Sequence, residues 1–188
     1  MKCMISPKRY FAFSDSYLMR LFIISPLFAL LLFLVTISVL SPYFETRFMV
    51  KEFEFVSSFL KKICHQYPSR CFYIFGSNMG LCARCFTIYL TLTFYCILYS
   101  FFDLKLRPKS KLIISISLII PLFIDGITQY YGFRQSNNFL RFITGVLAGS
   151  GLSIIFVSSY INVINGLFHK ILLTISHEGG MLNENSKL

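Results

Sequence analysis

Residues 21–40 read LFIISPLFALLLFLVTISVL, an apolar run without a single charged side chain. A helix needs about 20 such residues to cross the ~30 Å hydrocarbon core of a bilayer. The run therefore predicts a membrane-spanning helix, with Arg20 before it and Glu45 after it. Its length and the Ser41-Pro42 step that follows favour an uncleaved membrane anchor over a cleaved signal peptide.

Three further apolar runs follow. Cys85–Phe102 and Phe142–Phe168 are long enough to span a bilayer, whereas Leu112–Ile124 reaches that length only by continuing through Asp125 to about Tyr131. Too little chain remains outside these runs to build a large soluble core. The sequence predicts an all-α, multi-pass integral membrane protein of four helices, with the lipid bilayer as its main partner.

The net charge of +10 could indicate binding to nucleic acid, but the basic residues gather in short segments beside the spans. Such clustering orients membrane proteins, with the basic segments in the cytoplasm. We therefore expect no nucleic-acid partner, a cytoplasmic N-terminus, and a location in the cell (inner) membrane. The first connection is also basic, but it is long and partly balanced by acidic residues, so it counts less. This orientation puts that connection on the outer face.

The chain divides into an N-terminal tail with the first helix (1–47), a membrane domain (48–168) and a polar tail (169–188). Residues 48–63 alternate apolar and charged side chains at helical spacing. This pattern predicts a short interfacial helix, or a helix packed on the bundle. We expect 71–75 to be extended and 76–80 to turn back into the second span, as a re-entrant cap that brings Cys64 towards Cys82.

The cap concentrates groups that bind metals. Cys82-Ala83-Arg84-Cys85 would place two thiols on one helical face at a helix N-terminus, and Cys64-His65 precedes it in the chain. Zinc sites use four such ligands, often two of them from a C-x-x-C. We predict a site for zinc or iron built from Cys64, His65, Cys82 and Cys85. Cys71 competes for the fourth place, because adjacent residues such as Cys64 and His65 point apart. Disulfides, or cysteines that only fill space, are the alternatives.

A second set of polar residues lies near the ends of the spans. Charges near hydrocarbon face the protein interior and pair, so Asp125 should form an ion pair with Arg141 or Arg84. That pair would pin helices together, or serve transport or proton transfer. The full polar set is Gln66, Arg70, Arg84, Asp125, Gln129, Asn138 and Arg141. Gly145 and Gly149 predict a close helix-packing face, which would also allow a homo-oligomer.

These residues resemble a family of small bacterial and archaeal membrane proteins of unknown function, whose hallmark is C-H-Q followed by C-A-R-C. The resemblance covers about residues 60 to 152 and continues through Asp125-Gly126, Gln129 and Leu140-Arg141. It implies a multi-helix membrane protein and brings no substrate or cofactor. The family tends to have Ser where this chain has Cys71, which favours His65 as the fourth ligand. It also tends to have Thr-Gly in place of Phe86-Thr87.

The residues leave three functions open, one of them enzymatic. The first is a membrane protein with a metal-binding Cys/His site at the membrane interface. The second is a thiol–disulfide oxidoreductase that works with a membrane quinone, and the third is a small transporter that uses Asp125, Gln129 and Arg141.

Overall fold

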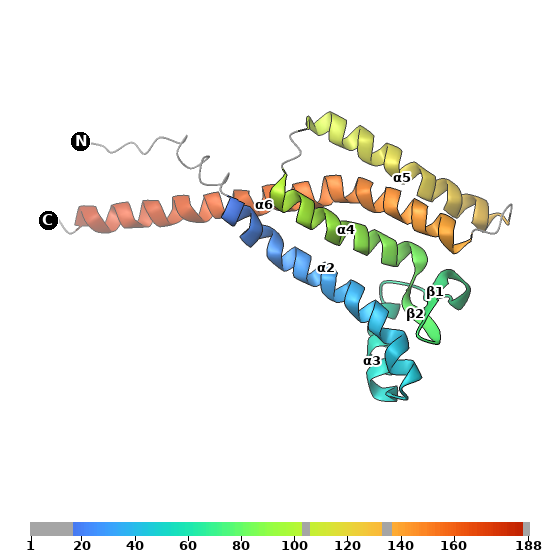
Figure 1. Ribbon diagram of the computed structural model, residues 1–188. Helices are drawn as coiled ribbons and strands as arrows, with labels where there is room; N and C mark the ends of the chain where they lie inside the picture. The colour runs from blue at the N-terminus through green and yellow to red at the C-terminus, as the bar shows by residue number, and fades with distance from the viewer. Residues whose placement is uncertain (1–16, 103–105, 133–136, 186–188) are drawn as a thin grey trace.

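The computed structural model describes residues 17–102, 106–132 and 137–185 of the chain. Within these ranges four helices are long and apolar enough to cross a membrane: α2 (Tyr17–Thr46), α4 (Ala83–Phe101), α5 (Pro108–Tyr130) and α6 (Asn138–Asn185). The predicted four-span helical architecture is therefore confirmed. The helices lie side by side in the order α2, α4, α6, α5, as Figure 1 shows.

The last helix is longer than the sequence indicated. The span in α6 ends near Phe168, but the helix continues to Asn185 and extends beyond the other helices (Figure 1). Residues 169–185 contain no proline, and polar side chains end a membrane span without ending a helix. The predicted boundary at 168 thus marks a change of composition within one helix.

Glycines let α6 approach its neighbours on both sides. A Cβ added to Gly149 would lie 2.8 Å from the Cβ of Thr91 on α4, and one added to Gly145 would lie 2.9 Å from that of Thr87. On the other side, Gly151 faces the backbone oxygen of Ser115 on α5. The predicted role of Gly145 and Gly149 in helix packing is confirmed. In the structure α4 of the same chain packs on this face, and the homo-oligomer predicted through it stays a prediction.

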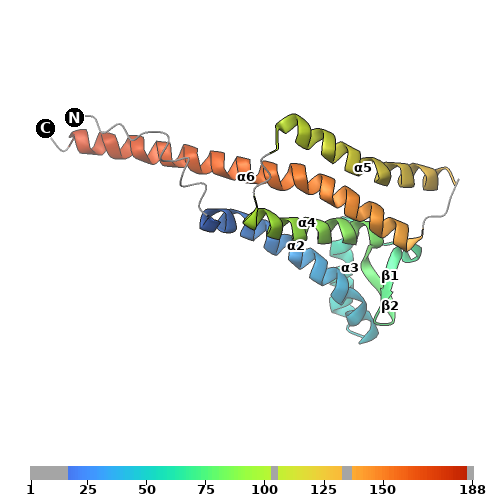
Figure 2. The ribbon, with the colours of Figure 1, turned by 45° about the horizontal axis from the view of Figure 1, so that its top comes forward.

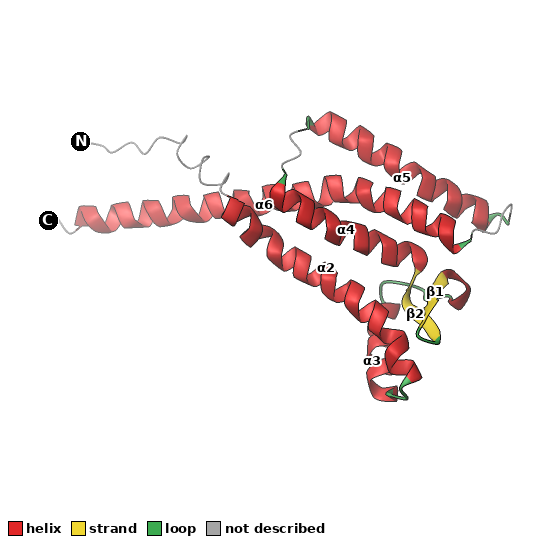
Figure 3. Cartoon of the chain, viewed as in Figure 1, coloured by secondary structure: helices red, strands yellow, loops and turns green. Residues whose placement is uncertain are grey.

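The connection between α2 and α4 folds into a small cap. It consists of α3 (Val50–Lys61), the 3₁₀ turn η1 (Pro68–Arg70) and a hairpin of β1 (Cys71–Ile74) and β2 (Ser77–Cys82), drawn in yellow in Figure 3. The predicted extended segment is β1. The predicted turn over 76–80 is wrong, because the loop is only Phe75-Gly76. Positive φ angles of 51° and 85° at these two residues allow a two-residue hairpin turn and leave Ser77–Cys82 free to pair.

The cap is packed on one end of the row of helices (Figure 2). Val56 and Leu60 of α3 are buried in a cluster against which Phe44 of α2 and Phe86 of α4 pack, so α3 packs on the bundle. Ser77 donates a hydrogen bond to the carboxylate of Glu45 at the end of α2. The ends of α2 and α5 and the starts of α4 and α6 therefore meet beside the hairpin.

Candidate metal centre

Three cysteines converge where the hairpin enters α4. Cys64 follows α3, Cys82 ends β2, and Cys85 lies in the first turn of α4. Their three Sγ atoms lie within 4.8 Å of one another. In the described ranges, this is the one group of three or more His, Cys, Asp or Glu residues close enough to share a metal ion. The predicted approach of Cys64 to Cys82 is thus present in the structure.

The convergence does not arise from a shared helical face. Cys82 stands before the helix as its N-cap residue, with a β-type ψ of 156°, and only Cys85 is helical. A strand end and a first helical turn therefore bring the two thiols together, which corrects the expectation of two helical positions. The backbone N–H of Cys82 also donates a hydrogen bond to Cys64 Sγ at 3.3 Å.

The hydrogen bonds within the group favour one thiolate. Donation from the thiols of Cys82 and Cys85 lowers the pKa of Cys64 to about 2, although burial acts in the opposite direction. The same contact with Cys64 raises the pKa of Cys82, which keeps its proton. Cys64 is 6% exposed, so its negative charge is held in a site largely closed to water. A cation is the ligand that such an arrangement favours.

Gln66 braces the loop that carries Cys64. Its side-chain nitrogen donates to the backbone oxygen of Gly80 at 2.7 Å, and its side-chain oxygen accepts from Ser57 Oγ at 3.3 Å. The backbone of Gln66 is left-handed, with a φ of 51°. The C-H-Q segment is therefore bound to α3 on one side and to β2 on the other. Sequence reasoning missed Ser57, because nothing in the pattern marks a serine as a partner of Gln66.

Two predicted ligands lie apart from the three sulfurs. The exposed ring of His65 stacks on Tyr67, with centroids 6.1 Å apart. Cys71 is paired with Cys82 in the hairpin register, yet its thiol donates to the backbone oxygen of Tyr67 at 3.3 Å. Burial raises the pKa of Cys71 to about 12, so it stays a neutral thiol. Ligation by His65 remains a prediction.

A polar cluster surrounds the start of α4 and α6. Arg84 forms the ion pair with Asp125 of α5 and donates to Gln129 Oε1 at 3.1 Å. Of the two predicted pairings of Asp125, the structure shows the one with Arg84. Because Arg84 is next to Cys85 in the chain, it links the polar cluster to the three-cysteine group.

Other members of the predicted polar set hold the hairpin. Arg141 Nη1 donates to Asn138 Oδ1 at 2.8 Å and to the backbone oxygen of Ser69 at 3.2 Å. Asn138 in turn donates to the backbone oxygen of Cys71 at 3.0 Å. The guanidinium of Arg70 lies over the ring of Tyr67, 5.2 Å from its centroid, at the edge of the cap. The acceptors, in η1 and β1 of the cap, are backbone oxygens, which no residue pattern reveals.

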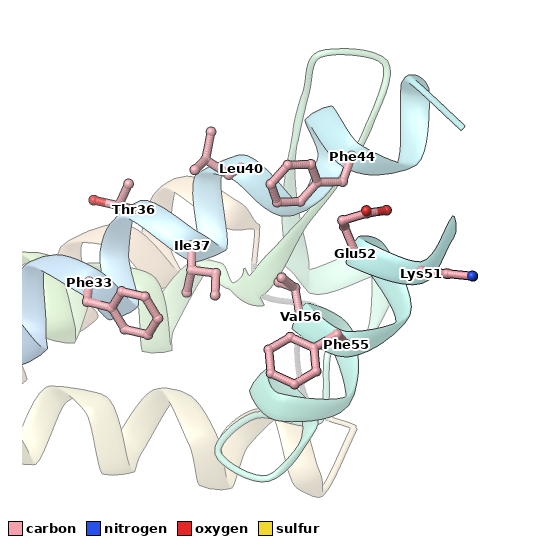
Figure 4. A pocket seen from close by; sticks show the side chains of 9 residues that line it. All are labelled: Phe33, Thr36, Ile37, Leu40, Phe44, Lys51, Glu52, Phe55 and Val56. Atoms are coloured by element: carbon pink, nitrogen blue, oxygen red, sulfur yellow. The ribbon is translucent and has the colours of Figure 1, made fainter. Parts of the chain in front are cut away.

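An apolar groove of about 560 Å³ lies between α2 and α3 (Figure 4). Aromatic and aliphatic side chains of both helices line it, with Lys51 and Glu52 at one end. It contains no thiol and no imidazole, so it is not the predicted site. It lies at the junction of α3 with the first span, α2.

The fold and these side chains define a class: a multi-pass membrane protein with three cysteines gathered at the mouth of a spanning helix. The chain belongs to a family of predicted membrane proteins (DUF2085), which matches residues 64–155. The resemblance seen in the sequence is thereby confirmed. The match begins at Cys64 and leaves α2 and α3 outside.

Two archaeal relatives are similar over most of their own length. An uncharacterised protein of Methanocaldococcus jannaschii, MJ1492, is 41% identical over 140 residues, which cover 70% of this chain and 87% of that protein. An uncharacterised protein of Methanothermobacter thermautotrophicus is 43% identical over 93 residues, covering 50% of this chain and 83% of that protein. No solved structure matches the chain.

Proposed function

We propose that Cys64, Cys82 and Cys85 bind a soft metal ion at the membrane interface, with zinc the first candidate and iron the second. The carrying observation is that their sulfurs lie within 4.8 Å of one another. Around a tetrahedral zinc ion with bonds of about 2.3 Å, sulfurs stand about 3.8 Å apart. Each pair therefore has at most about 1 Å to close, which side-chain rotation supplies.

The protein environment supports a cation at this place. The lowered pKa of Cys64 favours its thiolate, and the N–H of Cys82 already donates to its sulfur. Three thiolates leave a fourth position to a water molecule or to His65. His65 reaches the ion only if its ring leaves Tyr67, so a His65→Ala variant tells the two fourth ligands apart. Thiolate sulfur favours zinc, iron and copper(I) over hard ions such as magnesium.

The orientation is part of the proposal. Lys and Arg residues beside the spans favour a cytoplasmic N-terminus in the cell membrane, which puts the cap on the outer face. There the metal would join the loop after α3 to the hairpin and to α4. Such a site stabilises the cap and holds the start of α4 in place.

The redox and transport hypotheses have less support from the described residues. A thiol–disulfide oxidoreductase needs a reactive thiolate that a partner can reach. Cys82 and Cys85 are partly exposed, but the thiol with the lowered pKa, Cys64, is only 6% exposed. A transporter needs polar groups that bind a passing solute, and two of its three predicted groups, Asp125 and Gln129, are engaged by Arg84. Metal binding is therefore the function that the geometry supports best.

Elemental analysis of the protein purified in detergent under reducing conditions tests this proposal. The expected result is about one zinc or iron ion per chain, lost in Cys64→Ser, Cys82→Ser and Cys85→Ser variants. Cys71→Ser and Cys96→Ser are matched controls that should keep the metal, because both thiols are buried outside the group. A metal-free wild-type protein whose cysteines cycle between dithiol and disulfide would overturn the proposal in favour of redox chemistry.

A further inference from the structure

Two arginines converge at the mouths of α4 and α6. Arg84 is the second residue of α4, and Arg141 lies in the first turn of α6. A Cβ added to Gly145, one turn after Arg141, would lie 3.2 Å from the backbone oxygen of Arg84. The two helix starts are therefore in contact, and the positive charges of Arg84 and Arg141 are close enough to repel each other.

Within the described part of the chain, each of the two guanidinium groups has an N–H donor without an acceptor. The Nε atoms of Arg84 and Arg141 are buried and have no hydrogen-bond partner among the described residues. Arg141 is 6% exposed as a whole, and its hydrogen bonds to Ser69 and Asn138 are both made by Nη1. Buried N–H groups without an acceptor are rare in native proteins, so these two call for an explanation.

The charges around these donors favour an anion. The positive charge of Arg70 also lies near enough to Arg141 to repel it. The nearby carboxylate, Asp125, forms its ion pair with Arg84. In addition, the starts of α4 and α6 carry the partial positive charge of helix N-termini, where cations are unfavourable and anions are bound. The positive charge on the described side chains therefore exceeds the negative charge, even with one thiolate in the cysteine group.

We propose that Arg84 and Arg141 together bind a phosphate group, taken from a lipid headgroup or from free phosphate. A guanidinium presents planar N–H donors that match phosphate oxygens, and two of them from adjacent helices would hold one group between them. The side chain of Arg84 is 18% exposed, which gives the phosphate its route of approach. This site is distinct from the three-cysteine group and does not depend on a metal there.

The test uses the full chain as purified, delipidated in detergent. Calorimetric titration with inorganic phosphate measures the first source, and native mass spectrometry with added phosphatidic acid measures the second. Arg141→Gln and Arg84→Gln should each weaken binding about ten- to hundredfold. Arg141→Lys keeps the charge but loses the planar donors, so it should restore little of the affinity.

Arg47→Gln is the matched control, because Arg47 is an arginine at the same end of the molecule that lies over the ring of Tyr43. It should bind phosphate like the wild type. A cooperative thermal unfolding transition serves as the folding readout, and a Cys82→Ser variant, which removes one sulfur of the three-cysteine group, should still bind phosphate. A response to inorganic phosphate assigns a soluble anion, and retention of phosphatidic acid alone assigns a lipid headgroup. No binding of either probe by the wild type, or an equal loss in Arg47→Gln, would overturn the proposal.

Discussion

The side-chain amide of Gln66 donates a 2.7 Å hydrogen bond to the backbone carbonyl of Gly80 across 14 residues of sequence. This bond joins the segment after α3 to β2. Cys64 lies two residues before Gln66, and Cys82 lies two residues after Gly80. The bond therefore sets how closely the two cysteines approach, although Gln66 contributes no ligand atom.

Replacing Gln66 with Ala should weaken metal binding by about tenfold without changing the amount bound at saturation, as loss of a group that orients ligands does in other metal sites. Competition with a chromogenic chelator measures this change. Ser57→Ala removes only the weaker 3.3 Å bond to Gln66 and should have a smaller effect. Wild-type affinity in Gln66→Ala would show that the cysteines hold their positions without the brace.

Replacing Gly80 with Ala should destabilise the cap by about 1–3 kcal/mol, because neighbouring side chains already fill the space that the new methyl group would occupy. The new Cβ would lie 2.5 Å from Leu60 Cδ1 and 3.0 Å from the Cβ of Ser41. Thermal unfolding in detergent micelles measures the loss. Gly126→Ala is the control: nothing lies within 4 Å of its added Cβ, so in a helix it should be neutral or stabilising by about 1 kcal/mol. Equal melting temperatures for the two variants would contradict the packing described for Leu60.

Removing one partner of the ion pair between Arg84 and Asp125 should lower the free energy of unfolding more than removing both partners together. Each single variant, Arg84→Gln or Asp125→Asn, leaves one charge without its main partner, for a cost of about 3 kcal/mol. The double variant leaves neither charge stranded, so its cost should be smaller than that of either single variant. Unfolding free energies in mixed micelles complete this cycle. Additive costs would mean that the two side chains do not interact.

Most of the fold follows from apolar runs. The lengths of the four runs, including the continuation of the third through Asp125, predict α2, α4, α5 and the span in α6. The spacing of Gly145 and Gly149 likewise predicts a packing face. The strand Ser77–Cys82 is missed because Gly80 and its polar neighbours resemble a turn, while the real turn needs only Phe75 and Gly76.

Less of the candidate site can be predicted from the sequence. The spacing of Cys82 and Cys85, together with the preceding Cys64, predicts that these three sulfurs meet, but it leaves Cys71 open as a further candidate. The direction of a side chain depends on local hydrogen bonds that spacing does not encode. Cys71 lies opposite Cys82 in the hairpin, but its thiol is bound to Tyr67, and the ring of His65 stacks on that same tyrosine. Sequence therefore predicts that a cysteine lies near the site, but not whether its sulfur joins the three-cysteine group.

A cysteine placed at the tip of the hairpin should report the membrane orientation. Phe75 is 61% exposed at the turn, so a Phe75→Cys variant presents a thiol that a membrane-impermeant maleimide can reach. Because basic residues favour a cytoplasmic N-terminus, this thiol should be labelled in intact cells. A Leu106→Cys variant in the second connection, which leaves all charges unchanged, should be labelled only after the cells are made permeable. Metal-loaded protein without either substitution gives the background from the native cysteines. The reverse pattern of labelling would put the cap, and with it the three-cysteine group, in the cytoplasm. Reducing conditions there keep thiols from forming disulfides, so the cysteines would be available to metals even if they were not buried.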